Sequence, residues 1–265
     1  MLTACGALAA HRVKSPSVQL RQALHAVIDF CFPGTCVNCQ AQSEGVSPLC
    51  AKCSPLLEAL ESAPACALCA MPLAYADAPC PHCQGEGSKP FDRIVALGRF
   101  DDPLRAMIHA IKYHKAWPLA EHLAGRLRAQ ERVKALIERA EVIVPVPLHP
   151  WRRLSRGFNQ AEVIALKLAP HRRRVVRHPL VRLKPTETQT HFHSRASREA
   201  NLEDTFALDR AKEIRGRRVL LVDDVMTTGA TMRAAARELR KGNPAEISGL
   251  VIAIADPRGR QFQRI

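Results

Sequence analysis

Residues 219–232 read VLLVDDVMTTGATM, and this stretch decides the fold of the chain. Its four apolar residues are typical of a strand buried on both faces of a parallel sheet, and they run directly into Asp223 and Asp224. The turn TTGAT follows and leads into a predicted helix. Because α/β folds bind ligands beyond the carboxyl ends of their parallel strands, we expect a binding site at this turn.

The turn after the two acids suits a phosphate group. A helix N-terminus presents unpaired backbone N–H groups and the positive end of a dipole. Gly229 lets the backbone approach a ligand closely. Hydroxyl donors come from Thr227, Thr228 and Thr231. Since adjacent carboxylates accept hydrogen bonds from neighbouring hydroxyls or hold Mg²⁺, the stretch predicts a site for a ribose 5-phosphate.

An alternative for the same strand is the receiver domain of a response regulator, in which paired acids hold Mg²⁺. That fold needs nearly a whole domain after this strand, whereas only about forty residues follow here. The sequence therefore disfavours a receiver.

Strands alternate with helices on both sides of the opening stretch. Strands are predicted at residues 93–100, 141–148, 175–183, 217–225 and 246–255, and helices at residues 103–114, 119–140, 158–169 and 231–242. This alternation indicates an α/β fold with a parallel sheet. Residues 17–30 are predicted to form a short amphipathic helix, residues 84–90 a linker, and residues 184–201 a polar loop.

The charge of the chain points to an anionic partner. The 265 residues carry a formal charge of +14, and residues 151–200 alone hold twelve Lys or Arg against three Glu. Nucleic acid, a phosphorylated small molecule or a membrane surface would suit this charge, and a solvated basic surface is the alternative. No apolar run is long enough to span a membrane, and the N-terminus lacks the pattern of a signal peptide. We therefore expect a cytoplasmic protein.

Eight of the ten cysteines form one internal repeat. The segments CVNCQAQSEGVSPLCAKC and CALCAMPLAYADAPCPHC share the spacing C-x2-C, ten residues, C-x2-C. Two such knuckles make the closed four-thiolate site of structural zinc, so two zinc ions are predicted. In sequence order the ligand sets are Cys36, Cys39, Cys50 and Cys53, then Cys66, Cys69, Cys80 and Cys83. A crossed pairing of the knuckles stays open, as do redox use and an iron–sulfur cluster.

The cysteine segment has too few large apolar residues to fold alone, so metal binding would supply its folding free energy. A closed site leaves no position for chemistry on the metal, which favours a scaffold or an interaction module. Cys5 and Cys31 fall outside the repeat and are interpreted as ordinary thiols, and His82 as a surface residue.

The opening motif resembles the PRPP-binding signature of type I phosphoribosyltransferases, in which two acids precede T-T-G-x-T. Over most of its length the chain resembles the ComF family, the competence-protein-F and GntX group. The supporting segments are the cysteine knuckles, HAIKYHKAWPLA, VPVPLHPWRRLSRGFNQAE and TETQTHFHSRASREANLEDTF. The resemblance implies a type I phosphoribosyltransferase-like α/β domain over residues 91–265. A double zinc ribbon over residues 31–86 and an N-terminal segment over residues 1–30 would precede it.

The resemblance also implies roles for individual residues. Asp223 and Asp224 would bind the ribose hydroxyls of PRPP together with Mg²⁺. The 5-phosphate would be held by Thr227, Thr228, Gly229, Ala230 and Thr231. The pyrophosphate loop would span residues 146–149, with anion-binding support from Lys112, Arg152, Arg153 and Arg156. Asn159 and Gln160 would contact ligand or cap a helix. Residues 189–201, with Arg195 and Arg198, would form a lid or a solvated loop.

One departure from the family pattern bears on the reaction. Purine phosphoribosyltransferases usually begin the phosphate loop with Asp, which acts on the base, whereas this chain has Thr227. A hydroxyl is a poor general base at neutral pH, and no segment is identified as a nucleobase pocket. The sequence thus disfavours purine salvage and leaves the acceptor open.

Two functions remain as hypotheses. The first is a PRPP-binding phosphoribosyltransferase-like protein whose catalysis and acceptor are open. The second is a non-catalytic nucleic-acid-binding or adaptor protein that meets single-stranded DNA or DNA-uptake proteins. Only 5% of the residues are aromatic and the sequence shows no stacking platform, which counts against the second hypothesis.

Overall fold

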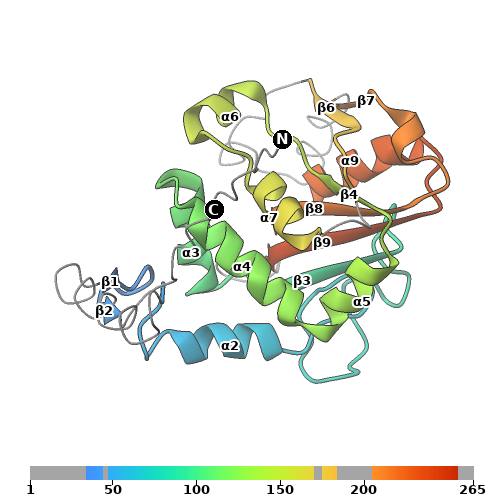
Figure 1. Cartoon of the computed structure of the whole chain (residues 1–265). Helices are drawn as coiled ribbons and strands as arrows, with labels where there is room; N and C mark the ends of the chain where they lie inside the picture. The colour runs from blue at the N-terminus through green and yellow to red at the C-terminus, as the bar shows by residue number, and fades with distance from the viewer. Residues whose placement is uncertain (1–33, 44–46, 170–174, 184–204, 256–265) are drawn as a thin grey trace, which may run out of the picture.

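The central element is a parallel sheet of five strands in the order β3-β9-β8-β4-β5 (Figure 1). The computed structural model describes residues 34–43, 47–169, 175–183 and 205–255. The strands are β3 Arg93–Arg99, β4 Val142–Pro145, β5 Val175–Val176, β8 Arg218–Met226 and β9 Glu246–Ile254. Every pair in this sheet is parallel, which confirms the predicted α/β fold.

Helices cover both faces of the sheet (Figure 1). They are α2 Ser54–Ser62, α3 Leu104–Tyr113, α4 Trp117–Ala129, α5 Glu131–Arg139, α6 Pro150–Arg156, α7 Gln160–Leu168 and α9 Ala230–Arg240, with a 3₁₀ turn η2 at Ala211–Glu213. One core joins α3, α4, α5 and α7, and the other core contains α9. The helical stretch predicted at residues 119–140 is two helices, because Gln130 adopts an extended conformation between them.

Strand β8 runs through the middle of the sheet, between β9 and β4. Its apolar residues alternate between the two cores, as the two faces of a strand require: Leu220 joins one core and Leu221 the other. Both side chains are fully buried. This position places the carboxyl end of β8, with Asp223 and Asp224, at the middle of the edge where the parallel strands end.

The two four-cysteine segments pack in different cores, on opposite faces of the sheet. The first packs in the same core as Leu97, and the second in the same core as Ile94. The second also binds the edge strand β3 directly, because the Ile94 N–H donates to the Leu68 carbonyl at 2.9 Å. An open strand edge would offer unpaired backbone groups to other chains, so this contact covers part of the sheet edge.

Helix α2 continues from the first knuckle and lies close against β3. At Gly98 an added Cβ would be 2.9 Å from the backbone oxygen of Leu60, so only glycine fits this approach. Glu61 at the end of α2 also pairs with Arg126 of α4, where the Arg126 Nη2 donates to a Glu61 carboxylate oxygen at 2.7 Å. The cysteine-rich segment and the sheet thus share buried cores. The predicted domain boundaries at residues 30, 86 and 91 stay a prediction.

The single strand predicted at residues 175–183 is wrong. Residues Val175–Val176 form β5 in the central sheet, whereas Leu180–Arg182 form β6, which pairs antiparallel with β7, Phe206–Leu208. Pro179 lies between them and has no N–H to continue a ladder, which explains the break. A small pair, β1 Gly34–Thr35 and β2 Gln42–Ser43, lies at the first knuckle.

Some expectations fall on residues outside the described ranges. These are the helix at residues 17–30, the lid at residues 189–201 and the two thiols Cys5 and Cys31. Within the described ranges, each helix is too short or too polar to cross a bilayer.

Candidate functional site

The two acids lie at the end of β8, and a lysine faces one of them. The Asp223 Oδ1 accepts a hydrogen bond from the Asp224 N–H at 2.8 Å. Lys112, at the C-terminal end of α3, places its Nζ 3.1 Å from the Asp224 Oδ2. Both side chains of this ion pair are largely buried, with 21% and 13% of their surfaces exposed. The predicted anion-binding Lys112 is therefore brought against the acid pair, where it balances one negative charge.

The other acid is held in an unfavourable electrostatic position. Burial and the neighbouring Asp224 charge raise the pKa of Asp223 from 3.8 to about 7, although Lys112 and Arg182 act in the opposite direction. A carboxyl group with such a pKa carries a proton part of the time at neutral pH. Hydrogen-bond donors or a cation at this position would favour its charged form. The acid pair is thus poised to receive hydroxyl groups or a metal ion.

Arg182 is the site residue that the sequence analysis missed. It lies on β6 with 8% of its surface exposed, and its Nη1 donates to the Pro147 carbonyl at 3.4 Å. Burial lowers the pKa of Arg182 to about 10, while the charge of Asp223 opposes this effect. Its guanidinium also lies over the Phe206 ring, 5.3 Å from the centroid. The sequence signal for this residue was a single arginine within the apolar run LVRL. Which face of the strand the arginine occupies depends on the antiparallel pairing of β6 with β7, which the sequence does not show.

Helix α6 carries the three predicted arginines, and it turns them in different directions. Burial and the charge of Arg156 lower the pKa of Arg152, while Tyr113 and Asp224 raise it, so Arg152 lies within electrostatic reach of the acid pair. Arg156 lies 5.9 Å from the centroid of the Tyr113 ring. Arg153 is 64% exposed and faces Glu162 at 3.6 Å. The structure therefore brings Arg152 and Arg182 within electrostatic reach of the acids, places Arg156 beside Tyr113, and leaves Arg153 turned to solvent.

The threonine-rich turn joins β8 to α9. Gly229 adopts φ +74°, a left-handed conformation that favours glycine, and it stands at the N-cap of α9. The Ala230 N–H donates to the Thr228 Oγ1 at 3.3 Å, and the Arg233 Nη2 donates to the Thr228 carbonyl at 2.8 Å. Thr227 and Thr231 are half-buried in the same turn. The predicted phosphate loop thus has a left-handed glycine, hydroxyl groups and a helix N-terminus in one place.

Asn159 and Gln160 begin helix α7. The Asn159 Oδ1 accepts from the Ala161 N–H at 3.1 Å, and the Asn159 Nδ2 donates to the Val146 carbonyl at 3.0 Å. Asn159 therefore caps α7 and holds the VPVP segment. The Gln160 Oε1 accepts from the Arg156 Nη1 at 3.3 Å, and its side chain is buried. These contacts position the loop and the arginine, and direct contact with a ligand stays a prediction for both residues.

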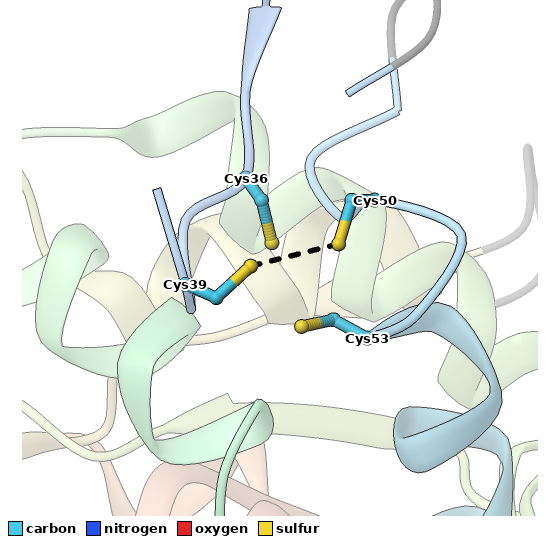
Figure 2. A group of neighbouring side chains, drawn as sticks. All are labelled: Cys36, Cys39, Cys50 and Cys53. Atoms are coloured by element: carbon cyan, nitrogen blue, oxygen red, sulfur yellow. Dashed lines mark hydrogen bonds between the residues drawn. The ribbon is translucent and has the colours of Figure 1, made fainter. Parts of the chain in front are cut away.

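The eight cysteines of the repeat gather into two groups of four. In each group, one C-x2-C knuckle pairs with the C-x2-C knuckle that follows it in the sequence. Figure 2 shows the thiols of Cys36, Cys39, Cys50 and Cys53 converging on one point. The second group contains Cys66, Cys69, Cys80 and Cys83. The sulfur atoms of each group lie within 4.8 Å of one another. The crossed pairing left open by the sequence is thereby excluded.

Each group has the chemistry of a metal-binding knuckle. Against the effect of burial, backbone N–H groups of Cys39 and Cys50 lower the pKa of Cys36 to about 6. In the same way, and again against burial, the backbone of Cys83 and His82 lowers the pKa of Cys80 to about 7. Lowered thiol pKa values favour the thiolate, the form that binds metals. In the second group, burial raises the pKa of Cys66 and Cys69. The capacity of each group to hold a metal ion therefore rests on the convergence of its four sulfur atoms.

Comparison with known proteins places the chain in a family. The family described as "Phosphoribosyl transferase domain" matches residues 154–264. Competence protein F of Haemophilus influenzae is 31% identical over an alignment of 227 residues, which covers 82% of this chain and 95% of that protein. The chain belongs to the ComF family. The resemblance seen in the sequence is thus confirmed, as is a phosphoribosyltransferase-type α/β fold with an N-terminal cysteine-rich module.

Other ComF-family relatives agree over different lengths. "DNA utilization protein YhgH" of Salmonella typhimurium is 31% identical over 225 residues, covering 81% of this chain and 94% of that protein. "Competence protein ComFC" of Bacillus subtilis is 37% identical over 112 residues, covering 42% of this chain and 43% of that protein. Among solved structures, an allosteric regulatory enzyme of purine biosynthesis aligns with TM-score 0.32 and 21% identity, over 50% of this chain and 25% of that enzyme.

Proposed function

We propose that this ComF-family chain binds PRPP, or another phosphorylated ribose, as a phosphoribosyltransferase-like protein. The observation that carries the proposal is the arrangement at the end of β8. There the acid pair is followed, within one turn, by the left-handed Gly229 and the N-terminus of α9. This arrangement offers hydrogen-bond acceptors for ribose hydroxyls next to donors for a phosphate.

The surrounding charges suit the pyrophosphate of PRPP. Arg152, Arg156 and Arg182 would face this group, and they come from α6 and β6. A guanidinium donates to phosphate oxygens through two parallel N–H groups and keeps its charge when it is partly buried. Lys112 would stay with Asp224 and hold the acids in place. Mg²⁺ would be held by the acids together with the ligand and would screen the charge of the pyrophosphate.

The reaction that such a site supports is substitution at C1 of the ribose. The bond from C1 to the pyrophosphate oxygen breaks, pyrophosphate leaves with the electron pair, and the acceptor forms the new bond to C1. The described residues contribute by positioning and by charge stabilisation of the leaving group. With Thr227 in place of a carboxylate, the protein would depend on an acceptor that needs no strong general base.

The cysteine groups would each hold a structural zinc ion. Four thiolates fill the tetrahedral coordination of Zn²⁺ and leave no open position for substrate. Since the two cysteine groups pack in the two cores beside the sheet, their metal ions would stabilise that packing rather than take part in chemistry. Thiolate ligation of this kind fits the reducing cytoplasm, where we place the protein.

Calorimetry with PRPP and Mg²⁺ tests the proposal, followed by a screen for pyrophosphate release with amines, nucleobases and other acceptors. PRPP binding that requires Mg²⁺ would support the proposal. Excess inorganic phosphate should compete less well against PRPP than against ribose 5-phosphate, because PRPP would also contact the site through its pyrophosphate. A folded, metal-loaded protein that gives no heat with PRPP at millimolar concentration would contradict it.

A second candidate function is binding of single-stranded DNA. It is favoured by the names of the relatives, which link them to competence and DNA utilization, and by the +14 charge. The structure also exposes aromatic rings on which bases could stack, which the sequence had not indicated. Trp151 is 73% exposed and Tyr113 is 61% exposed, and both lie beside the arginines of α6. DNA bases stack on such rings.

The two candidates are separated by substitution of the acids. If DNA binding uses the rings and arginines, Trp151→Ala should weaken a salt-dependent affinity for an oligonucleotide, while Asp223→Asn with Asp224→Asn should leave it unchanged or stronger. The second candidate would be contradicted if Trp151→Ala left the oligonucleotide affinity unchanged while the two acid substitutions weakened it.

A further inference from the structure

A second concave site lies outside the acid pair and the phosphate turn. It is a groove of about 570 Å³ between the start of α4 and the turn that leads into α7. Its apolar lining includes Trp117, Phe158 and Leu166. The Trp117 and Leu166 side chains are 52% and 59% exposed, although large apolar side chains are usually buried. The groove therefore presents an indole ring and apolar surface to solvent.

Positive charges surround this apolar lining. Lys115, Arg156 and Lys167 belong to the groove, and Glu121 is its single acid. The Lys167 Nζ lies 2.9 Å from the Glu121 Oε2, so that pair is balanced across the groove. Lys115 and Arg156 remain as the positive excess, and the Arg156 guanidinium lies 5.9 Å from the centroid of the Tyr113 ring. An occupant with a flat apolar part and one anionic part matches this distribution.

We propose that the groove binds a mononucleotide, with the base against Trp117 and the phosphate between Lys115 and Arg156. Its volume lies within the roughly 300–1,000 Å³ of small-molecule sites. A purely apolar ligand would leave the two cations without a counter-charge, and inorganic phosphate would leave the indole exposed. Base stacking on an aromatic ring, together with charge-assisted hydrogen bonds to phosphate, uses both features.

This site is distinct from the proposed PRPP site. The phosphate turn belongs to β8 and α9, whereas the groove belongs to α4 and α7, which pack in the opposite core. Arg156 is the residue that the two sites share. Binding of a mononucleotide in the groove does not require that PRPP binds at the acids, so the two proposals can fail separately.

The chain offers a direct optical test, because it contains only two tryptophans. Trp151→Phe leaves Trp117 as the single indole, and AMP can be titrated while its fluorescence is excited where adenine does not absorb. We expect saturable quenching by AMP. Ribose 5-phosphate lacks the ring and adenosine lacks the phosphate, so each should bind about tenfold more weakly or worse.

Substitutions in the same background locate the binding. Leu166→Glu places a negative charge in the groove and should weaken AMP binding about tenfold or more. The matched control is Leu56→Glu on α2, where the leucine is 52% exposed and far along the chain from the groove, and it should leave AMP binding unchanged. Gly229→Val, which disturbs the phosphate turn, should also leave AMP binding unchanged.

Three results would overturn the inference. Quenching that does not saturate, or that is equal in the Leu166→Glu and Leu56→Glu variants, would show that AMP does not occupy the groove. Loss of AMP binding in Gly229→Val would place AMP in the phosphate turn and leave the PRPP proposal intact. A short oligonucleotide that displaces AMP at far lower concentration would assign the groove to a DNA strand instead.

Discussion

The raised pKa of Asp223 predicts that removing its charge stabilises the protein. Asp223→Asn keeps the size of the side chain, and the amide oxygen can still accept the hydrogen bond from the Asp224 N–H. The substitution removes one of two adjacent negative charges that Lys112 balances only in part. Functional residues are often held in environments that are unfavourable for stability, so replacing them commonly stabilises the fold.

The magnitude follows from proton linkage. The folded state holds the Asp223 proton more tightly than the unfolded chain does, so this group destabilises the fold as pH rises from 3.8 to about 7, and the loss is constant above. At about 1.4 kcal/mol per pH unit, the full window corresponds to about 4 kcal/mol. Asp223 is only half-buried, so water screens part of this cost, and we expect about 2 kcal/mol.

Urea unfolding of parent and variant, between about pH 4 and pH 8, measures this effect. The stability advantage of Asp223→Asn should be small at the acidic end and grow to about 2 kcal/mol at the alkaline end. Asp209→Asn is the matched control, because Asp209 is 58% exposed and a surface carboxylate contributes little to stability. An advantage that stays constant with pH, or a variant less stable than the parent at pH 8, would refute the reasoning.

Three further predictions concern the metal, the arginines and the packing of α2. Elemental analysis should find about two zinc ions per chain, and Cys53→Ser should remove one of them; iron with labile sulfide would contradict the assignment. Arg182→Gln should weaken PRPP binding about tenfold in calorimetry, whereas the exposed Arg153→Gln should change it less than about twofold. Equal effects would mean that Arg182 does not serve the ligand. Gly98→Val should lower the free energy of unfolding by about 1–3 kcal/mol, since its side chain would meet the Leu60 backbone, and an unchanged urea midpoint would contradict that packing.

The sequence predicted the features that depend on local pattern. The apolar run before Asp223 indicated a buried parallel strand, and β8 occupies the middle of the sheet. The glycine of the TTGAT turn suggested a special backbone conformation, and Gly229 has φ +74°. The repeated C-x2-C spacing predicted two groups of four thiols, which the structure brings together. In each case the signal lies within a few residues, so no knowledge of the tertiary structure is needed.

Other features depend on contacts between distant segments. Arg182 joins the site because the chain leaves the central sheet between β5 and β6, and β6 then pairs with β7. An apolar run with one arginine does not reveal this. Helix α6 has no buried residue and hence no apolar periodicity to announce it. The sequence also did not indicate that the two four-cysteine groups would pack in different cores, since their cysteines share those cores with residues far along the chain.

The central claim is that the acids recognise the ribose and the turn recognises the phosphate of one ligand. Calorimetry with PRPP and with inorganic phosphate, on the parent and on Asp223→Asn with Asp224→Asn, tests it most directly. The double variant should bind PRPP about tenfold to a hundredfold more weakly, as expected for a lost charge-assisted hydrogen bond of roughly 1.5–3 kcal/mol. It should bind inorganic phosphate as well as the parent or better, because two negative charges near the turn are gone. A double variant that binds PRPP like the parent would contradict the ribose assignment and leave the acids with a structural role.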